Sequence, residues 1–577
     1  MAKALPRNAE LADQLDLLAD LSEILDEESF KVIAYRRAAT RIRESPLPVA
    51  ELALDGKAKD LPGIGRTIEN KVVEVVNVGE MEALTRRRER VPAGVVDFLR
   101  LPGVGPKTAA RFWTQLGITS LASLKTAAED GRLRDLSGMG ARSEEKILKA
   151  LEAGLGEQAE PRRLLGHALP AVRRVAEELA AHPAAIAVSE AGSVRRRRET
   201  VRDLDLIATS SDAPALIEAF CEGKWVSEVI ARGDTKATVV GHDGLRFDLR
   251  VVPGECYGNV LQHFTGSKDH NIALREEAQR RGLSISEYGV TTVETGEVVT
   301  HASEDDLYAY LGYATMAPEL REGTDEIRAG RDGELPKLVE REDLRGEMHC
   351  HSTWSTDAKN TIEEMARAAK GRGYRFLCLT DHSHYLRDGR LEAQWEEIAA
   401  VNALVKPFRV LRGIEANIRA DGMLDVADDV LEQLDWVIAS LHTSFDRSPT
   451  ERILGAMENP HVDCIGHLTG RRLLKRQGAA VDVERVVEHA VVTGTALEVN
   501  SQADRLDMRD THARLAGEAG VRIPITTDAH SIGALGFAEL GVAQARRAWL
   551  TKEQILNTRP WREIEKLGKR NGGQDES

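Results

Sequence analysis

The chain has 577 residues, of which 42% are hydrophobic and 30% are charged, and its formal net charge is −15. This length exceeds what one hydrophobic core fills, and at roughly 150 residues per domain it predicts about four globular units. No apolar run has the form of a signal peptide or approaches the ~20 residues of a membrane span, so we expect neither secretion nor a membrane partner. The five cysteines form no CxxC pair, which favours a reducing compartment and a cytoplasmic protein.

The negative net charge argues against a nucleic-acid partner, but DNA responds to local patches of charge. Basic runs occur at residues 86–90 (RRRER) and 195–198 (RRRR). These runs are either solvated helix faces or DNA contacts, so the motifs have to decide.

Residues 1–155 predict a helical region with glycine-containing turns. LPGIG (61–65), LPGVG (101–105) and LSGMG (136–140) each precede a helix-forming stretch. Glycine permits the tight turn, and the N–H groups of the following helix can bind a phosphate. The repeat resembles the helix-hairpin-helix motif, which implies that Gly63, Gly65, Gly103 and Gly105 contact the DNA backbone. The alternative is three helix-hairpin turns that bind nothing, and the repetition favours DNA.

Residues from about 160 to 315 alternate strand-like runs with helices, which predicts an α/β unit. In AGSVRRRRETVRDLDLIA (191–208), Gly192 and Ser193 form a small turn that can approach a phosphate. Asp203 and Asp205 lie two residues apart on a strand, so their carboxylates share a face, and Asp248 follows on a neighbouring strand. Three such carboxylates can hold two Mg²⁺ ions against a triphosphate. A lone DxD pair, however, is common on protein surfaces.

Together with FTGSKDHNIALR (264–275), this motif resembles the palm of X-family DNA polymerases, which include DNA polymerase beta. The resemblance implies a DNA-directed DNA polymerase that fills gaps in damaged DNA with deoxynucleoside triphosphates. Asp203, Asp205 and Asp248 would then hold Mg²⁺ or Mn²⁺. It also implies a set of nucleotide-binding residues: Gly192, Ser193, Arg196, Arg246, Gly266, Ser267, Asn271 and Arg275. Four residues depart from the usual signature, namely Arg202 before the first aspartate, His263 before Phe264, and Arg197 and Val201.

The N-terminal segments 30–39 and 61–72 resemble the lyase domain of the same family. There a lysine forms a Schiff base with an abasic sugar, and Lys71 stands at that position, with Lys31 and Tyr35 in support. Such a lysine must be partly neutral near pH 7. The alternative is a surface lysine that contacts a phosphate.

Beyond a charged segment at 321–343, predicted to be a linker, apolar runs alternate with helical stretches. Six of these runs end in a His, Asp or Glu, as expected for a barrel whose chemistry lies at the carboxyl ends of its strands. The candidate metal ligands are His349, His351, Asp357, His382, Glu415, His442, His467, Asp528 and His530. Mixed imidazole and carboxylate ligation suits Zn²⁺, Mn²⁺ or Fe²⁺, and nine ligands can seat up to three ions.

The pattern HxH, TDH, GIE, GH and DAH resembles the PHP phosphoesterase superfamily. That resemblance implies a (β/α)7 barrel, and in bacterial X-family polymerases it implies 3′→5′ exonuclease, 3′-end processing and abasic-endonuclease activity. The expected architecture is multidomain, with helical helix-hairpin-helix domains, an α/β nucleotidyltransferase palm and a PHP barrel. The predicted boundaries are 1–80, 81–155, 156–320, 321–343 and 344–577.

Two alternatives stay open. In the first, the chain is a DNA-binding scaffold with an inactive palm, which Arg202 would favour. In the second, it is a phosphatase of small metabolites whose N-terminal half serves only as a recruitment module. The repeated glycine turns and the complete set of palm carboxylates count against both. We expect a monomer.

Overall fold

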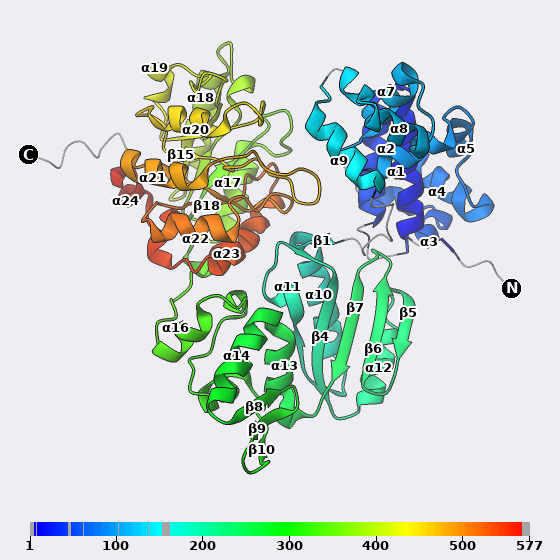
Figure 1. The fold of residues 1–577 in the computed structure, drawn as a ribbon. Helices are drawn as coiled ribbons and strands as arrows, with labels where there is room; N and C mark the ends of the chain where they lie inside the picture. Colours follow the sequence, from blue (N-terminus) through cyan, green and yellow to red (C-terminus); the bar gives the residue numbers. More distant parts are fainter. Residues whose placement is uncertain are drawn as a thin grey trace, which may run out of the picture. The chain divides into compact units, whose positions relative to one another are not determined.

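The computed structural model (Figure 1) describes residues 5–6, 8–43, 45, 48–61, 63–101, 103–136, 138–152 and 162–567. The predicted boundary at 155/156 therefore lies outside the described residues. The chain divides into two compact units, one of 1–161, 177–187 and 210–251, the other of 162–176, 188–209 and 252–577. Among the described residues, none of the helices combines the length and the apolar character that a membrane crossing needs.

The N-terminal region is helical, as predicted. Its helices are α1 (Asn8–Ile24), α2 (Ser29–Arg43), α3 (Val49–Leu54), α4 (Arg66–Val78), α5 (Glu82–Arg88), α6 (Ala93–Asp97), α7 (Pro106–Leu116), α8 (Leu121–Glu129) and α9 (Ala141–Glu152). Leu11, Leu15 and Leu18 recur at helical spacing in α1 and are fully buried. One hydrophobic cluster extends from Leu11 to Ile147. The segments predicted as two domains, 1–80 and 81–155, therefore share a core.

The three glycine turns have a common geometry. Gly63, Gly103 and Gly138 have φ of 86°, 79° and 79°, a region where a side chain is strained. Gly65 and Gly105 cap the N-termini of α4 and α7. A Cβ added to Gly65 or Gly105 would meet no atom within 4 Å, so the unpaired N–H groups of the first turn are open to a phosphate.

The predicted α/β unit contains a five-stranded sheet of order β2-β4-β7-β6-β5. Its elements are α10 (Leu165–Ala180), β2 (Ala185–Glu190), α11 (Gly192–Arg195), β4 (Asp203–Ser210), α12 (Ala213–Cys221), β5 (Val226–Arg232), β6 (Lys236–Gly241) and β7 (Arg246–Val251). A short pair, β1 (Arg163–Leu164) and β3 (Thr200–Val201), precedes β4. In β7, Phe247 and Leu249 are buried, so the alternating Arg246 and Asp248 lie on the other face.

A smaller subdomain follows. It comprises α13 (Tyr257–Thr265), α14 (Lys268–Arg280), α15 (Glu304–Tyr310) and an antiparallel sheet of β8 (Leu283–Ser286), β9 (Gly289–Thr292) and β10 (Val298–Val299). Glu304 lies between two arginines, Arg195 and Arg321. Burial alone would raise the pKa of Glu304, but Arg321 and Arg195 lower it to about 2.

The segment 321–343 is packed, in contrast to the linker expected from its charge. It contains α16 (Glu326–Asp332), and the Arg321 side chain is only 1% exposed. Glu326 accepts hydrogen bonds from the backbone of Gly323 and Thr324 and approaches His270 Nδ1 at 2.7 Å. Buried ion pairs and caps thus absorb the charges that made the segment resemble a solvated linker.

The C-terminal part is a parallel βα barrel, which confirms the predicted fold class. The strands β11 (Gly346–Cys350), β12 (Phe376–Leu379), β13 (Arg409–Asn417), β14 (Trp436–Ser440), β15 (Cys464–Ile465) and β16 (Ala496–Leu497) form one sheet in chain order. β17 (Val499–Asn500) continues β16 and pairs with β18 (Ile525–Thr526). A parallel bridge between Cys350 and Ala529 joins the last strand region to the first.

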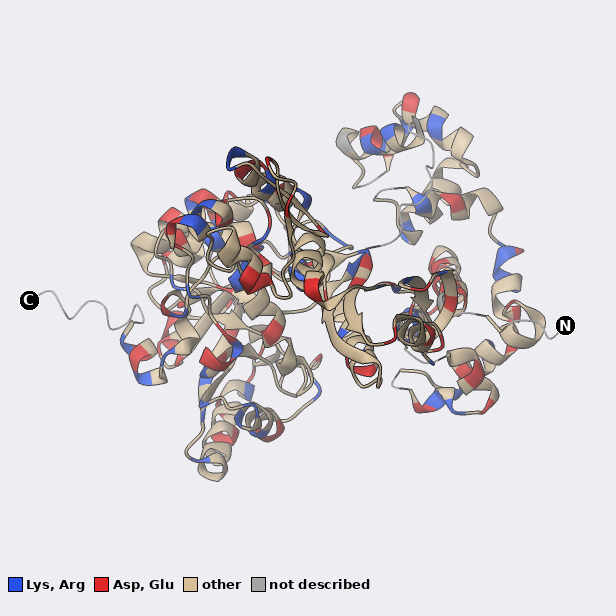
Figure 2. Cartoon of the chain, turned by 90° about the horizontal axis from the view of Figure 1, so that it is seen from below, with Lys and Arg blue, Asp and Glu red and all other residues tan. Residues whose placement is uncertain are grey.

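Helices cover the outside of the barrel (Figure 1): α17 (Ile362–Gly371), α18 (Arg390–Val405), α19 (Asp428–Leu431), α20 (Pro449–Met457), α21 (Val483–Thr493), α22 (Asp510–Glu518), α23 (Ala538–Arg547) and α24 (Trp561–Leu567). The strands β11 and β14 are buried over their whole length, as parallel strands beneath helices require. Figure 2 shows basic and acidic residues interspersed over the helices, so the net charge of −15 does not describe any one surface.

Candidate metal centre and nucleotide pocket

The carboxyl ends of the barrel strands bring nine side chains together. The structure places all nine sequence-predicted ligands here, on β11, β13 and the loops that follow β11, β12, β14, β15 and β18: His349, His351, Asp357, His382, Glu415, His442, His467, Asp528 and His530. They line or lie beneath a cavity of about 460 Å³. The convergence follows from the fold, because parallel strands in a barrel end on one face.

Glu415 is the centre of this cluster. Its buried carboxylate approaches His382 Nδ1 at 2.7 Å, His467 Nε2 at 3.0 Å and His442 Nε2 at 3.2 Å. Three groups have ligand atoms within 4.8 Å of one another: His351 with His382 and His530, His349 with His351 and Glu415, and His382 with Glu415 and His442. The geometry therefore offers three positions to cations.

Three buried polar atoms at the centre of the cluster have no hydrogen-bond partner among the described residues. His349 Nε2 and Glu415 Oε2 are buried and unbonded, at 3.5 Å from each other. His382 Nδ1 is also unbonded, although it lies 2.7 Å from Glu415 Oε2. Buried unpaired polar atoms are costly. A divalent ion between imidazole nitrogens and carboxylate oxygens would satisfy them, and such a donor set suits Zn²⁺, Mn²⁺ or Fe²⁺.

Residues behind the cluster fix the orientation of its imidazoles. His349 Nδ1 lies 2.5 Å from Glu498 Oε1, and His442 Nδ1 lies 2.7 Å from Asn417 Oδ1. Each contact leaves Nε2 directed at the cluster, the arrangement that metal-binding histidines commonly have. Sequence reasoning missed Glu498 and Asn417, although Glu498 stands inside the strand-like run ALEVN.

The pKa values of the cluster shift in both directions. Burial lowers the pKa of His382, but Glu415 and Asp357 raise it to about 10, so a metal bound there would displace a proton. Burial, with His382 and His530 nearby, lowers the pKa of His351 well below its ordinary value. Contacts with His382 and His530, at 3.6 and 3.4 Å, hold the pKa of Asp357 well below its usual range. Neutral imidazoles and ionised carboxylates are the forms that bind metal.

In the palm, Gly192 and Asp205 are in direct contact. Gly192 has φ of 63°, and a Cβ at this position would lie 2.1 Å from Asp205 Oδ2. Only glycine fits both the backbone and the space. Asp203 lies two residues before Asp205 on β4, and both side chains are partly exposed. The carboxylates of β4 are therefore accessible to an ion.

The third predicted carboxylate, Asp248, lies on β7 and has two partners of its own. Thr238 Oγ1 donates a hydrogen bond to Asp248 Oδ1, and Arg246 Nε lies 3.2 Å from Oδ2. Arg246, expected to bind the nucleotide, thus contacts the third carboxylate.

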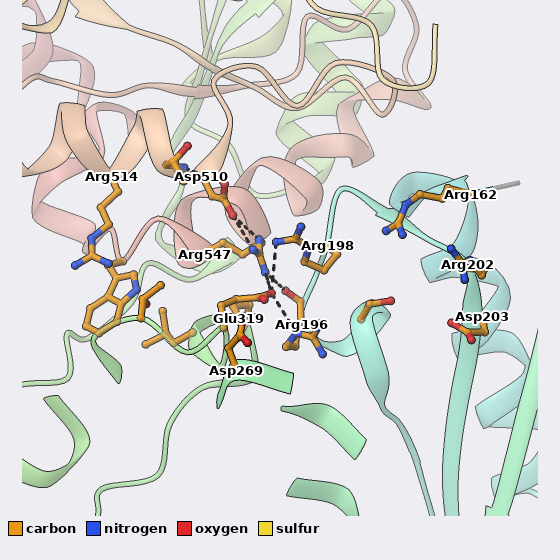
Figure 3. Close-up of a pocket in the computed structure, with 16 residues that line it drawn as sticks. Arg162, Arg196, Arg198, Arg202, Asp203, Asp269, Glu319, Asp510, Arg514 and Arg547 are labelled. Atoms are coloured by element: carbon orange, nitrogen blue, oxygen red, sulfur yellow. Dashed lines mark hydrogen bonds and ion pairs between the residues drawn. The ribbon is translucent and has the colours of Figure 1, made fainter. Parts of the chain in front are cut away.

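A cavity of about 710 Å³ opens beside Ser193 and Asp203 and is lined by six arginines (Figure 3). Arg196 Nη1 donates to the Thr265 carbonyl at 2.7 Å, and its Nε lies 3.1 Å from Glu322 Oε1. Burial lowers the pKa of the Arg196 guanidinium, and Glu322 opposes that shift. Five carboxylates share the lining with the six arginines, namely Asp203, Asp269, Glu319, Glu322 and Asp510, so most of the positive charge is balanced within the cavity.

Arg547 of α23, in the barrel, reaches the same cavity. It donates to the Arg196 carbonyl at 2.8 Å, and it pairs with Glu322 at 2.8 Å and Asp510 at 2.6 Å (Figure 3). Its side chain is only 3% exposed. The barrel thus contributes a buried cation to the pocket of the predicted triphosphate-binding residues, and no motif in the sequence signals this contact.

The remaining predicted nucleotide-binding residues surround the start of α14. Gly266 has no room for a Cβ, which would lie 2.8 Å from Asn271 Oδ1, and Ser267 accepts a hydrogen bond from His270 N. Asn271 Nδ2 donates to the His263 carbonyl at 2.8 Å, and Arg275 Nη2 lies 3.2 Å from His263 Nδ1. His263, the departure noted in the sequence, therefore contacts both residues predicted to face the nascent base pair.

Lys71 lies on α4, with its Nζ 6.0 Å from the centre of the buried Tyr35 ring. Burial lowers the pKa of Lys71, and Arg87 and Arg86 act in the same direction. Lys31, the other predicted supporting residue, is paired with Glu28 at 2.6 Å.

Four family models match separate parts of the chain. Their descriptions are "Helix-hairpin-helix domain" for residues 6–81, "SAM-like Helix-hairpin-helix tandem" for 95–153, "DNA polymerase beta thumb" for 260–322 and "PHP domain" for 347–502. The matches confirm the predicted helix-hairpin-helix and PHP regions.

Similar proteins of known name are of two kinds. The DNA polymerase/3′-5′ exonuclease PolX of Bacillus subtilis is 40% identical over 573 residues, which cover 96% of this chain and 98% of that protein. A probable phosphatase of Caldanaerobacter subterraneus is 31% identical over 223 residues, covering 36% of this chain and 85% of the phosphatase. A probable phosphatase of Thermoanaerobacter is 32% identical over 230 residues, covering 36% and 89%.

Proposed function

Because the chain belongs to the X family of DNA polymerases that carry a PHP domain, we propose that it fills short gaps in damaged DNA and trims 3′ ends with its barrel. The relative from Bacillus subtilis is named both a polymerase and a 3′-5′ exonuclease. The observation that carries the second activity is the cluster around Glu415, whose unpaired buried atoms fit a multinuclear metal centre. The monomeric state and the cytoplasmic location expected from the sequence stay predictions.

For synthesis, we assign the metal ions to Asp203, Asp205 and Asp248. Divalent ions held there would supply the Lewis-acid chemistry that activates a primer 3′-hydroxyl and neutralises a leaving pyrophosphate. Gly192 lets the backbone of α11 approach the β4 carboxylates closely, so Ser193 lies where a triphosphate oxygen would arrive. Arg196 is held over that space by Thr265 and Glu322. Asn271 and Arg275, braced by His263, would face the new base pair.

For trimming, we assign up to three ions, Zn²⁺, Mn²⁺ or Fe²⁺, to the nine side chains around Glu415. Ions in such a centre bind a phosphate and lower the pKa of a bound water to make the nucleophile. Glu498 and Asn417 orient His349 and His442 toward the centre. Arg505, which lines the cavity 3.7 Å from Asp528, would contact an oxygen of the phosphate.

Separation-of-function variants test both assignments. In the full chain, Asp203→Ala with Asp205→Ala should abolish primer extension on a gapped duplex while 3′-end degradation in Mn²⁺ continues. His349→Ala should do the reverse. Synthesis that survives loss of both aspartates would refute the palm assignment, and degradation that survives His349→Ala would refute the barrel assignment. Mild chelation followed by Mg²⁺ alone should restore only synthesis if the barrel needs a softer ion.

A lyase activity is supported by the surroundings of Lys71. Its lowered pKa makes the neutral amine accessible, as attack on an abasic sugar requires. Borohydride should trap the full chain on an abasic duplex, and Lys71→Ala should trap at least tenfold less. Lys149→Ala, which removes an exposed lysine paired with Glu145, is the matched control. Equal trapping by Lys71→Ala would assign the lysine to phosphate contact instead.

A second candidate for the barrel is the hydrolysis of small phosphate monoesters. The two phosphatases named above favour it, because the PHP part is the region of this chain with a phosphoesterase fold. Hydrolysis of p-nitrophenyl phosphate at a rate far above that of an oligonucleotide would support this candidate over the nuclease.

A further inference from the structure

A second cavity of about 660 Å³ lies beside the metal centre and carries an excess of positive charge. Its charged lining consists of five cations and one carboxylate, listed here in chain order: Glu199, Arg471, Arg472, Lys475, Arg476 and Arg509. Most of them come from one hairpin, residues 471–478, between β15 and α21. Glu199 pairs with Arg471, whose side chain is only 7% exposed. The other four cations therefore have no carboxylate in the lining of this groove to pair with.

The groove and the metal cavity adjoin each other at Arg472. Arg472 lines both of them. A molecule whose terminal phosphate reaches the ligands around Glu415 thus has a cationic path past Arg472 into the groove. A small phosphate ester would occupy the metal cavity alone, because that cavity already measures about 460 Å³.

The hairpin is anchored on the barrel and exposes its tip. Arg472 and Arg476 form an antiparallel bridge, with Arg472 N donating to the Arg476 carbonyl at 2.9 Å. The Arg476 guanidinium lies over the Phe445 ring, 4.3 Å from its centre. At the tip, Leu474 is 58% exposed and Lys475 is 71% exposed. An exposed leucine between cations offers an apolar surface to a base while the cations meet the backbone.

Nearby carboxylates neutralise only part of this charge. Asp504 pairs with Arg472 at 2.6 Å and with Lys475 at 3.8 Å, so one carboxylate serves two cations. Burial lowers the pKa of Arg476, and the neighbouring Arg472 and Arg505 lower it further. Crowded cations of this kind favour a polyanionic ligand over a neutral one.

We propose that the hairpin 471–478 and Arg509 bind the phosphodiester backbone of a single DNA strand whose 3′ end lies in the metal centre. The groove would hold the nucleotides that precede the scissile bond, and it would select a polymer over a small monoester. The inference rests on the proposed nuclease function of the barrel, and it identifies the substrate class of that site as single-stranded DNA.

The variant to test is Lys475→Glu with Arg509→Glu in the full chain. Both residues are exposed, and neither lines the metal cavity. The matched control is Arg367→Glu with Arg372→Glu on α17, where two exposed arginines line neither cavity. Each protein is assayed in Mn²⁺ on two substrates, a 3′-labelled single-stranded oligonucleotide and p-nitrophenyl phosphate.

We expect the groove variant to lose at least tenfold in kcat/KM on the oligonucleotide, with p-nitrophenyl phosphate hydrolysis unchanged. The control should keep both rates. Each lost phosphate contact should also reduce the slope of log kcat/KM against log salt by about 0.7. An equal loss in the control, an equal loss on both substrates, or no loss would overturn the proposal.

Failure of the nuclease function gives a different result. If the wild-type chain hydrolyses the small ester but not the oligonucleotide, the nuclease proposal fails. Binding of the oligonucleotide in the groove is then measured by its inhibition of ester hydrolysis. The oligonucleotide should then inhibit ester hydrolysis, with a Ki at least tenfold higher in the groove variant. Absence of inhibition, or a chain that hydrolyses neither substrate, would refute the groove as well.

Discussion

At the scale of single residues, Glu498 shows how a side chain outside the ligand set supports it. The carboxylate is fully buried and accepts hydrogen bonds from Thr526 Oγ1 and from the His467 backbone N–H, in addition to its contact with His349. It therefore connects the ends of three strands to one imidazole. Its negative charge also makes His349 a stronger donor to a metal.

Glu498→Gln is expected to weaken metal binding in the barrel by about 10–100-fold, since the amide keeps the shape but loses the charge. The measurement is the Mn²⁺ concentration that gives half-maximal hydrolysis of p-nitrophenyl phosphate, with primer extension in the same preparation as the reference for intact protein. Glu363→Gln, an exposed residue of α17, is the control. An unchanged Mn²⁺ requirement would mean that Glu498 only fills space.

The candidate metal ligands were identified from the sequence. The residues that orient or pair with another side chain were not. The nine candidate ligands stand at or just after the ends of apolar runs, a pattern that can be recognised in a single sequence. Glu498, Asn417 and Glu322 have no such pattern, because their roles depend on which side chain of a distant segment reaches them. Their pairings span large sequence separations, as for Glu498 and His349, which are 149 residues apart.

At the scale of elements, the two glycines of each turn have different expected roles. The first allows the backbone conformation, and the second leaves the helix N-terminus open for binding. Gly63 requires its positive φ, whereas Gly65 has φ of −91° and Gly105 has −92°, which any residue adopts. The second glycine of each turn is therefore not needed for the backbone conformation. Its open surface at the N-termini of α4 and α7 is the feature that a ligand would use.

Gly65→Ala with Gly105→Ala should leave the fold intact and weaken binding of a gapped duplex at least fivefold, because the added methyl groups keep a phosphate away from the helix N–H groups. Fluorescence anisotropy gives the affinity, and circular dichroism with a thermal melt gives the fold. Gly63→Ala is the contrasting variant, which should cost about 1–2 kcal/mol of stability through its left-handed backbone. Unchanged affinity in the double variant would assign the turns to packing alone.

The helices and strands were largely predictable from the sequence, except where a high density of charged residues suggested a linker. Periodicity and turn residues predicted the N-terminal helices and the barrel strands. The segment 321–343 has no amphipathic rhythm, since its polar groups are paired inward, as for Arg321 with Glu304 and Glu326 with His270. The sequence does not distinguish a charged residue that is paired inside the fold from one that is exposed to solvent.

At the scale of the whole molecule, the barrel is built into the nucleotide pocket rather than attached beside it. Arg547 links α23 to Glu322 and to the backbone of Arg196. Asp510 of α22 completes the buried set. The barrel therefore supplies a buried cation to the cavity beside the proposed nucleotide-binding residues.

Arg547→Ala is expected to impair synthesis although the residue belongs to the barrel. Loss of the cation leaves Asp510 without its arginine partner, at a cost of about 3 kcal/mol, and Glu322 then pairs more fully with Arg196. The KM for deoxynucleoside triphosphates should rise at least fivefold, with ester hydrolysis by the barrel retained. Arg367→Ala, which removes an exposed arginine, is the control. Unaltered nucleotide kinetics would show that the link is only structural.

The barrel closes at the bridge between Cys350 and Ala529, so its ligand set can be complete only late in biosynthesis. His349 and His351 leave the ribosome early, but Asp528 and His530 follow about 180 residues later, and the carboxylates and imidazoles meet only when β18 docks against β11. Loading with metal is therefore a late event in maturation. A nascent polypeptide released before residue 528 would contain most of the ligands and still lack a closed centre.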